Sequence, residues 1–317
     1  MKITNQIIWE WKQYLINRDY SQNTLQNYLT DTRWFFDFIS TGWDINTEEI
    51  TLKWVEDWKT YLKDEKTPRN SIYYQVKPNL SPATIQTKLT ALKSFLKFMN
   101  CMYDEGLDYR KIEQKRIKSD YIEYITEDEF KMLMSFIGSY EKYRINSLRM
   151  QLLCNIGYTS GLRLSEMLNL HVRDVLDWET RITGKWNKTR WVFFTNSSKE
   201  LLEQYLEERN NPIPRTWIVE KPSDFVFISH NSGYDYWNPI SKQTVCERMK
   251  KYSDWMELGK RITIHSLRHS YATRLLESWF NIREIQELMG HSDIQTTQTY
   301  LHVLKSNLKN KVDLVFA

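Results

Sequence analysis

Apolar residues recur every three or four positions over most of the first hundred residues, which is the spacing of an amphipathic helix. One such stripe runs through Ile8, Trp11 and Leu15. A second begins after Ser21, whose side chain suits a helix N-cap, and continues to Ile39. Two further stripes consist of Val55, Trp58 and Leu62, and of Ile85, Leu89, Leu92, Phe95, Leu96 and Met99. The pattern predicts four helices that pack as one N-terminal domain over residues 1–110.

The helical periodicity lapses between about residues 104 and 121, where basic side chains gather: Lys111, Lys115, Arg116 and Lys118. A solvated linker has this composition, and so does a basic strap that lies along DNA phosphates. We therefore expect a linker over residues 111–121, between the N-terminal domain and a second domain of residues 122–317.

The second domain is predicted to be mostly helical, with one small β-hairpin. Thr126 can cap a helix together with Glu129, three residues later. Two segments rich in β-forming residues, around Ile182 and Val192, flank a turn that extends from Gly184 to Arg190. The fold class expected for the whole chain is therefore mainly α, with a small sheet in the C-terminal domain.

Glycine, proline and asparagine interrupt the second domain between residues 210 and 240, where we expect an irregular stretch around a short strand, Phe225–Ile228. Helical spacing resumes near Ser241. Further helices are expected from His265 to Glu277 and from Ile282 to Met289, where Gly290 provides a stop signal.

Length, charge and cysteine content narrow the class of protein. The 317 residues suffice for two domains, and 44 Lys+Arg against 40 Asp+Glu give a formal charge of only +4, so phosphate binding would need local basic faces. The three cysteines, Cys101, Cys154 and Cys246, form no C-x-x-C pair and are typical of free thiols in a reducing compartment. No apolar run is long enough for a membrane span, and no signal-peptide pattern opens the chain. We expect a soluble cytoplasmic protein.

Arginine and histidine in the C-terminal half suggest chemistry on a phosphodiester. In-line attack on phosphorus concentrates negative charge on the non-bridging oxygens, which metal ions or fixed guanidinium groups can stabilise. The sequence contains no persuasive carboxylate cluster for metal ions. Arg163 and Arg268 are therefore the candidates for a phosphate clamp, and His265 lies three residues before Arg268 on the same predicted helix face.

The pair His265 and His269 also has the spacing of two zinc ligands on a helix. The usual catalytic zinc motif has glutamate directly after its first histidine, whereas Ser266 stands there in this chain. The cationic Arg268 between the two rings would also oppose a divalent ion. We therefore expect no metal, and His269 is interpreted as a packing residue.

Tyr300 is the candidate nucleophile. A phenol with a pKa near 10 is a poor nucleophile at neutral pH unless a base or neighbouring cations assist it. His265 could accept its proton, and His291 could donate a hydrogen bond to the phosphate. The leaving 5′ oxygen needs a proton, which Lys185 or Lys188 of the hairpin turn could deliver, with Lys185 preferred because it follows Gly184 directly.

These residues resemble the boxes of the tyrosine recombinase, or phage integrase, family. Three segments carry the resemblance in the family's order: Gly161–Leu168, His265–Thr273 and Leu288–His302. The resemblance implies a two-domain clamp around double-stranded DNA, in which Tyr300 forms a 3′-phosphotyrosyl bond and strands are exchanged through a Holliday junction. It also implies that no ATP, metal or other cofactor is needed.

The same resemblance implies the assembly and type of enzyme. Family members act as homotetramers on two recombination sites with inverted repeats. The apolar tail after Tyr300 would dock into a neighbouring subunit or pack onto its own domain. Because the chain begins almost at once with the core-binding helices, a simple Xer-like or Cre-like type is expected. Integration, excision, inversion and chromosome-dimer resolution all remain open.

Two competing functions share these motifs. A type IB topoisomerase-like enzyme would relax DNA by the same chemistry without a partner site, and a non-catalytic DNA-binding relative would keep only the fold. The presence of all six candidate residues disfavours the second alternative. Trp186 stands where the family often has glycine after the hairpin lysine, and therefore the choice between Lys185 and Lys188 stays open.

Polar residues of two helices and the linker are candidates for DNA contact, although a solvated helix face would have the same composition. They are Gln86, Lys88 and Lys93 in the fourth helix, Lys115, Arg116 and Lys118 in the linker, and Lys242, Gln243 and Arg248 after Ser241.

Overall fold

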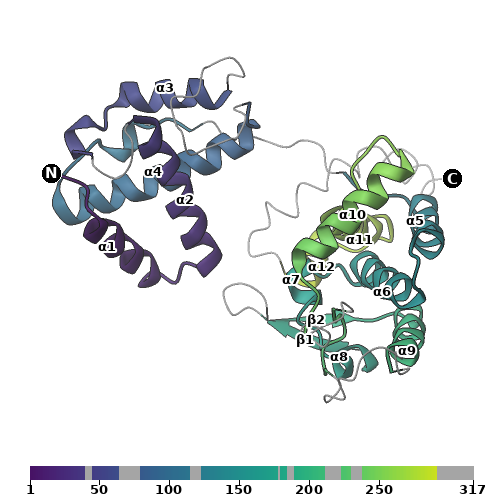
Figure 1. The fold of residues 1–317 in the computed structure, drawn as a ribbon. Coiled ribbons are helices and arrows are strands. Elements are labelled where there is room, and N and C mark those ends of the chain that lie inside the picture. The colour runs from purple at the N-terminus through teal and green to yellow at the C-terminus, as the bar shows by residue number, and fades with distance from the viewer. Residues whose placement is uncertain are drawn as a thin grey trace, which may run out of the picture. The chain divides into compact units, whose positions relative to one another are not determined.

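The computed structural model divides the chain into two compact units, Met1–Lys118 and Ser119–Ala317, both shown in Figure 1. It describes residues 1–39, 45–63, 79–114, 123–177, 179–183, 189–210, 223–229 and 238–290. Helices dominate these residues, and their one sheet has two strands. The prediction of a mainly α fold with a small hairpin is confirmed.

The described residues of the first unit form four α-helices at the four predicted places: α1 (Asn5–Ile16), α2 (Gln22–Ile39), α3 (Leu52–Lys63) and α4 (Pro82–Tyr103). Helices α2 and α4 pack against each other, and both α1 and α3 contact this pair. Two short 3₁₀ turns, η1 (Thr47–Glu49) and η2 (Tyr109–Lys111), complete the unit. The Ser21 and Ser81 hydroxyls accept hydrogen bonds at 3.2 Å from the first turns of α2 and α4, as N-caps do.

Aromatic side chains fill the core of the first unit. Trp11 and Phe36 both meet the ring of Phe95 edge-on, at centroid distances of 5.1 and 5.3 Å. Phe35 and Trp58 form a similar pair at 5.1 Å. All five rings are fully buried. Much of the aromatic content of this unit therefore stabilises its helix packing.

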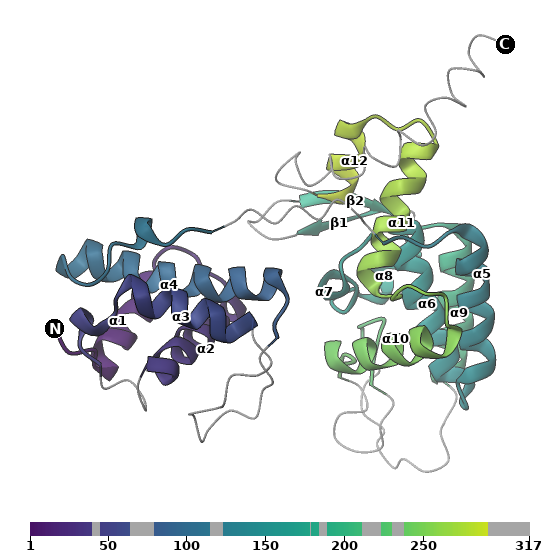
Figure 2. The same ribbon diagram turned by 90° about the horizontal axis from the view of Figure 1, so that it is seen from above.

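Helix α6 forms the centre of the second unit and contacts α5, α9 and α11, an arrangement visible in Figure 2. It is buried on nearly all sides from Ser147 to Ser160, so it has no solvent-facing stripe that periodicity could identify. The helices of this unit are α5 (Glu127–Tyr140), α6 (Arg144–Ser160), α7 (Leu164–Met167), α8 (Val172–Leu176), α9 (Asn196–Asn210), α10 (Lys242–Met256), α11 (Ile264–Glu277) and α12 (Ile282–Met289).

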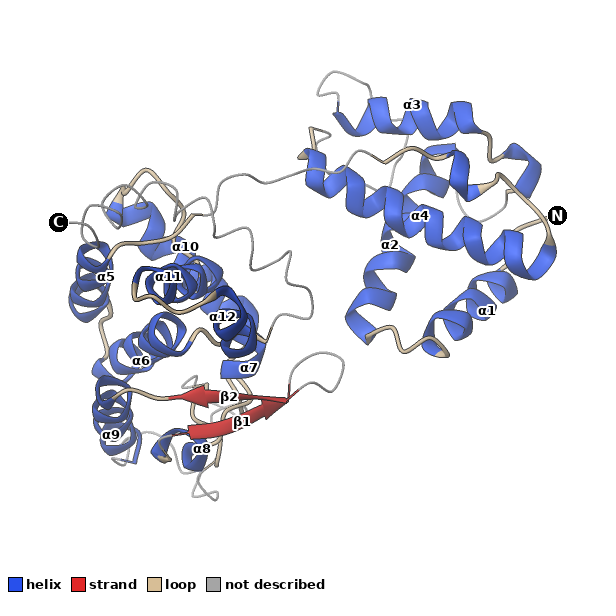
Figure 3. Ribbon diagram, turned by 180° about the vertical axis from the view of Figure 1, so that it is seen from behind, coloured by secondary structure: helices blue, strands red, loops and turns tan. Residues whose placement is uncertain are grey.

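The β-hairpin consists of β1 (Glu179–Thr183) and β2 (Thr189–Phe193), which pair antiparallel with Ile182 opposite Arg190. The turn was expected to extend to Arg190, but Thr189 and Arg190 already belong to β2. Along β2, Arg190 and Val192 are buried while their neighbours are exposed. Helix α12 contacts β2, beside the red hairpin in Figure 3.

The strand expected at Phe225–Ile228 is not a strand of a sheet. Only its two ends form isolated bridges, Phe225 with His171 and Ile228 with Pro239. Between them, Val226 N–H donates to the Leu170 carbonyl at 2.9 Å. Val226, Phe227 and Ile228 are buried, and the hydrogen bonds of the segment are divided between two different partner segments, so no continuous ladder forms.

Capping residues predicted from the sequence stand at the expected helix ends. Thr126 and Glu129 form a reciprocal capping box, and Ser241 caps α10. Helix α11 begins at Ile264, one residue before the predicted start, because the Thr263 hydroxyl accepts from the Ser266 N–H at 3.0 Å. Among the described helices, none combines the length and apolar character that crossing a membrane would require.

Candidate active site

The turn after α6 places Arg163 at the edge of the site. Helix α6 ends at Ser160 and is capped by Gly161, which has a φ of 60°, in the left-handed region that favours glycine. A Cβ at this position would lie 2.3 Å from Cδ1 of Tyr271 on α11. The ring of Tyr271 therefore packs directly on the Gly161 backbone, and Arg163 follows two residues later as the residue that precedes α7.

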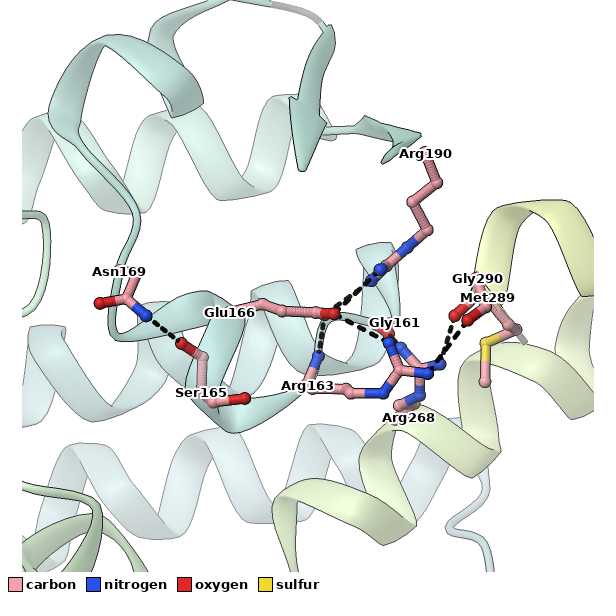
Figure 4. Close-up of polar contacts among 9 residues, drawn as sticks. All are labelled: Gly161, Arg163, Ser165, Glu166, Asn169, Arg190, Arg268, Met289 and Gly290. Carbon is pink, nitrogen blue, oxygen red and sulfur yellow. Dashed lines mark hydrogen bonds and ion pairs between the residues drawn. The ribbon is translucent and has the colours of Figure 1, made fainter. Parts of the chain in front are cut away.

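Arg163 is half-buried and hydrogen-bonded at both ends of its guanidinium group. Its Nη1 donates to Glu166 Oε1 at 2.8 Å, and its Nη2 donates to the Gly290 carbonyl at 3.2 Å, as Figure 4 shows. Glu166 Oε2 also accepts from the Arg163 backbone N–H at 2.8 Å. These contacts join α7 to the C-terminal end of α12.

Arg268 lies in α11 and is buried, with 4% of its surface exposed. It donates one hydrogen bond to the Gly161 carbonyl and another to the Met289 carbonyl. Arg163 and Arg268 thus use the neighbouring carbonyls of Met289 and Gly290, and their guanidinium groups lie together in Figure 4. Because backbone carbonyls carry no net charge, these contacts hold the two guanidinium groups in place without cancelling charge, and the carboxylate of Glu166 is a separate, charged partner of Arg163.

Two histidines lie one turn apart on α11, and both are biased toward the neutral form. Desolvation and the charges of Arg268, Lys242 and Arg163 lower the pKa of His265. Burial, followed by the effects of His265 and Arg268, lowers the pKa of His269 to about 4. Both imidazoles are therefore neutral near pH 7, and the exposed His265 can accept a proton.

The same electrostatic effects show that the structure brings together three predicted residues. The charges of Arg163 and Arg268 both act on His265, although a hundred residues of sequence separate Arg163 from His265. Lys242, proposed from the sequence as a DNA contact, acts on His265 as well. The cluster is cationic and contains one neutral imidazole.

Two residues of the site had no role in the sequence-based interpretation, Glu166 and Arg190. Burial acts to raise the pKa of Glu166, but the hydrogen bonds and charges of Arg190, and then of Arg163, lower it to about 2. Glu166 is therefore ionised at all ordinary pH values. The spacing of three residues between Arg163 and Glu166 was a sequence signal that could have identified Glu166. The sequence contained no such signal for Arg190, because its contact with Glu166 depends on the hairpin.

Three of the six predicted catalytic residues lie outside the described residues: Lys185, His291 and Tyr300. The alternative proton donor Lys188 and the predicted linker contacts Lys115, Arg116 and Lys118 lie outside them as well. Gly290, which directly precedes His291 in the sequence, is described. It ends α12 with a φ of 62°, as its identity predicted. Among the described residues, no three His, Cys, Asp or Glu side chains gather as a metal site requires.

The predicted DNA contacts of α4 have partners within the first unit. The Lys88 ammonium is buried, lies 2.6 Å from Asp31 Oδ1 and sits over the Trp34 ring at 3.7 Å. Lys93 donates to the Ile112 carbonyl at 2.9 Å, and Gln86 is half-buried. A DNA contact by Lys88 therefore remains a prediction that would require exchange of its ion pair.

The predicted contacts of α10 differ in their exposure. Gln243 is exposed and donates to Glu247 at 2.8 Å, and Lys242 is exposed at the first position of the helix. Arg248 is bound to the buried carboxylate of Glu141 at 2.5 and 2.6 Å. Lys242 and Gln243 are thus the more accessible of the three candidates.

Comparison with known proteins identifies the family. The model of the phage integrase family matches residues 123–307, and that of the phage integrase N-terminal SAM-like domain matches residues 8–101. Tyrosine recombinase XerC of Pediococcus pentosaceus is 30% identical over 311 residues, covering 96% of this chain and 95% of that protein. Tyrosine recombinase XerD of Listeria innocua is 28% identical over 317 residues, covering 96% and 97%.

Solved structures share the fold at lower identity. A lambda integrase dimer bound to a COC′ core site matches with a TM-score of 0.67 and 16% identity, covering 93% of this chain and 76% of that chain. XerH site-specific recombinase bound to palindromic difH substrate matches with a TM-score of 0.65 and 19% identity, covering 95% and 82%. The resemblance first visible in the sequence motifs is confirmed, and the chain belongs to the phage integrase family, the tyrosine recombinases, which are enzymes that cut and rejoin DNA.

Proposed function

We propose that the protein is a site-specific recombinase in which Tyr300 attacks a DNA phosphate. The phenolic oxygen forms a bond to phosphorus while the bond to the 5′ oxygen breaks, which leaves a 3′-phosphotyrosyl linkage and a free 5′ hydroxyl. The 5′ hydroxyl of a partner strand then reverses the step. Repeating the exchange on the second strand pair resolves a Holliday junction. The number of phosphate ester bonds is unchanged, so neither ATP nor another energy source is consumed.

The fixed pair of guanidinium groups is the observation that carries this proposal. Arg163 and Arg268 are held by carbonyls of the Gly161 turn and the α12 end, which belong to the protein itself. Donors that are already in place stabilise charge developing on the non-bridging oxygens without a reorganisation cost. Arginine suits this role because its charge is permanent and its planar fork fits two phosphate oxygens.

Proton transfer in both directions can be assigned to residues of this chain. His265 is neutral near pH 7 and would accept the phenol proton from Tyr300. Lys185 or Lys188 would donate a proton to the leaving 5′ oxygen, and His291 would donate a hydrogen bond to the phosphate. The proton lost by the nucleophile and the proton gained by the leaving group are thereby both accounted for.

We assign DNA binding to both parts of the chain. Residues 1–110 would form the core-binding domain, residues 111–121 the linker and residues 122–317 the catalytic domain. The active assembly would be a homotetramer on two sites with inverted repeats, joined by exchange of the C-terminal tails. The DNA bound in the lambda integrase and XerH structures supports double-stranded DNA as the partner.

A covalent-trapping experiment tests the proposal. Fragments from around the gene, nicked next to candidate sites so that the cleaved end diffuses away, are mixed with wild type or Tyr300→Phe protein in the presence of chelator. Wild type alone should give a slowly migrating protein–DNA adduct on a denaturing gel. Tyr300→Phe should bind the same fragments with nearly unchanged affinity, because only one hydroxyl is lost.

Other outcomes would contradict parts of the proposal. An adduct with Tyr300→Phe would remove Tyr300 as the nucleophile, and dependence of the adduct on a divalent ion would reject the metal-free mechanism. Relaxation of supercoiled DNA at every sequence, without pairing of sites, would instead indicate the topoisomerase-like activity. Sequence-specific binding by wild type without any adduct, even with two paired sites, would indicate a non-catalytic DNA-binding protein.

A further inference from the structure

We propose that Arg190 is a positioning residue, which fixes the catalytic Arg163 through the shared carboxylate of Glu166. The inference rests on the proposed function of Arg163 as a phosphate clamp. It adds to that site a residue of β2 that would not itself touch the substrate.

Arg190 makes a two-point contact with Glu166. Its Nη1 donates to Oε1 at 2.9 Å and its Nη2 donates to Oε2 at 2.7 Å. Both side chains are almost completely buried, with 5% and 7% exposed. This paired geometry is the strongest arrangement available to a guanidinium and a carboxylate, and it fixes the plane of the carboxylate.

Both oxygens of that carboxylate also accept hydrogen bonds from Arg163. Oε1 accepts from Arg163 Nη1 at 2.8 Å, and Oε2 accepts from the Arg163 backbone N–H at 2.8 Å. Glu166 thus lies between the two arginines, which are drawn on either side of it in Figure 4. Rotation of the carboxylate would displace the Arg163 guanidinium, and the contact with Arg190 opposes that rotation.

Arg190 also supports the second attachment point of Arg163, the carbonyl of Gly290. A Cβ at Gly290 would lie 2.8 Å from Cδ and 3.0 Å from Nη1 of Arg190, so the side chain packs directly against this turn. The carbonyl of the same glycine accepts from Arg163 Nη2 at 3.2 Å. Arg190 therefore contacts both groups that hold Arg163, one on α7 and one at the end of α12.

Arg190 is too deeply buried to act as a phosphate ligand itself. Both Nη atoms are used by Glu166, and its Nε is buried without a hydrogen-bond partner among the described residues. Arg163 is different, because 30% of its side chain is exposed. Arg163 can meet a phosphate, whereas Arg190 acts through Glu166.

Charge gives the arrangement a recognisable pH signature. The charged groups that act on Glu166 are Arg190 from β2 and Arg163 from the turn before α7, and together they overcome the effect of burial. Tyr271, on α11, lies in the field of Arg190, and burial raises the pKa of its phenol, which stays neutral. Without Arg190, burial is opposed by Arg163 alone, so the pKa of Glu166 should rise and its protonation in mild acid should release Arg163.

The test compares Arg190→Met with wild type in single-turnover cleavage of the nicked DNA, at saturating DNA concentration. Methionine keeps a long unbranched side chain but removes the charge and the donors. We expect cleavage to slow by about 10- to 100-fold, as small displacements of a catalytic group do, while the Kd for DNA changes little. Arg190→Lys keeps the charge without the planar fork, and its cleavage rate should lie between the rates of wild type and Arg190→Met.

Arg181→Met is the matched control. Arg181 belongs to the same hairpin, but it is exposed and lies over the Trp191 ring at 4.4 Å. Its loss should leave the cleavage rate unchanged. Thermal unfolding of every variant identifies any that fails to fold. If Arg190→Met does not fold, Arg190→Lys carries the test.

A double-mutant cycle provides the decisive readout. Adding Arg190→Met to Arg163→Ala should slow cleavage no further than Arg163→Ala alone, because the positioned group is already absent. The ratio of the wild-type rate to the Arg190→Met rate should also increase as the pH falls from 8 to 5.5. His265 titrates in both enzymes, and because Arg163 lowers its pKa, displacement of Arg163 changes the ratio in the same direction.

Additive losses in the cycle, or a rate ratio independent of pH, would overturn the positioning role and leave Arg190 as a structural residue. Wild-type cleavage rates for Arg190→Met and Arg190→Lys would overturn it as well. These results differ from failure of the proposed function, in which wild type itself would form no covalent adduct.

Discussion

Among its described residues, the second unit has two buried glutamates with arginine partners, Glu141 and Glu166, and only Glu166 belongs to the candidate active site. Glu141 accepts two contacts from Arg248, at 2.5 and 2.6 Å, and a hydrogen bond from the Tyr252 hydroxyl. Glu166 accepts from two guanidinium groups, Arg190 and Arg163. The side chains of Arg248 and Arg163 are equally accessible, at 32% and 30%.

The difference between these clusters lies in how much positive charge remains available. Arg248 directs its contacts to a carboxylate that bonds no other guanidinium among the described residues, so the pair is close to neutral. Arg163 shares the carboxylate of Glu166 with Arg190 and also donates to the carbonyl of Gly290. Arg268, beside it, donates to two carbonyls. Exposure alone therefore does not distinguish Arg163, which we propose binds phosphate, from Arg248. The distinction depends on whether the other hydrogen-bond partners of each arginine and its carboxylate are charged or neutral.

Loss of Arg268 should have the largest effect of the changes that follow from this comparison. Arg268→Ala is expected to slow single-turnover cleavage by about 10²- to 10³-fold, the usual cost of removing a preorganised donor to a developing charge. Arg248→Ala is the control, because it removes the same group from the structural cluster. Measured at saturating DNA, equal losses in the two variants would contradict the distinction between the clusters.

Glu141→Ala should show the opposite behaviour. It leaves Arg248 without its carboxylate and the buried Tyr252 hydroxyl without its acceptor. We expect the free energy of unfolding to fall by about 3 kcal/mol. This value is at the lower end of the range for a broken buried ion pair, because Arg248 can reach water. Chemical denaturation measures this loss. The cleavage rate of the folded fraction should stay within about threefold of wild type, because no described residue is a partner in both clusters.

Gly161→Ala tests the turn that positions Arg163 and supplies a carbonyl to Arg268. The substitution adds a Cβ in contact with Tyr271 at a φ of 60°, and we expect a loss of about 2 kcal/mol in unfolding free energy together with slower cleavage. Gly259→Ala is a matched control, since its φ is 67° but no atom lies within 4 Å of the added Cβ. Equal destabilisation by both would mean that the Tyr271 contact is unimportant.

The smallest effect concerns His269 and the pH dependence of stability. Its pKa of about 4 in the folded protein is below the ordinary value of 6.5, so the unfolded chain binds the proton more readily. Stability should therefore fall as the pH is lowered from 6.5 toward 4, by about 1 kcal/mol between pH 7 and 5.5 from this group. His269→Gln should flatten this part of the curve of unfolding free energy against pH. An unchanged slope would show that His269 is readily protonated in the folded protein.

Much of the fold could be predicted from local patterns. The four N-terminal helices, the capping box at Thr126 and the end of α12 at Gly290 all depend on residues within one or two turns of each other. Patterns failed where burial has no periodic signature, as in α6. They also failed at Phe225–Ile228, where a β-rich segment is bridged only at its ends.

The candidate site likewise contains residues that could be predicted from local sequence patterns and residues that could not. Arg163, His265 and Arg268 were recognisable because each lies in a motif of consecutive residues, and the structure brings them together. Lys185, His291 and Tyr300 stay predictions from such motifs. The role of Glu166 was unassigned even though it lies in the first motif, since its importance comes from a partner on another element.

The sequence by itself determined the helix pattern, the family and the residues able to carry the chemistry, because these depend on side-chain identity and short spacings. The tertiary structure decided which carboxylate faces which arginine, and which arginine keeps its charge available. The contact between Arg190 and Glu166 spans 24 residues and exists only because β2 pairs in a register that turns Arg190 inward, toward Glu166. Such a contact follows from the path of the chain in space, which no local pattern of residues specifies.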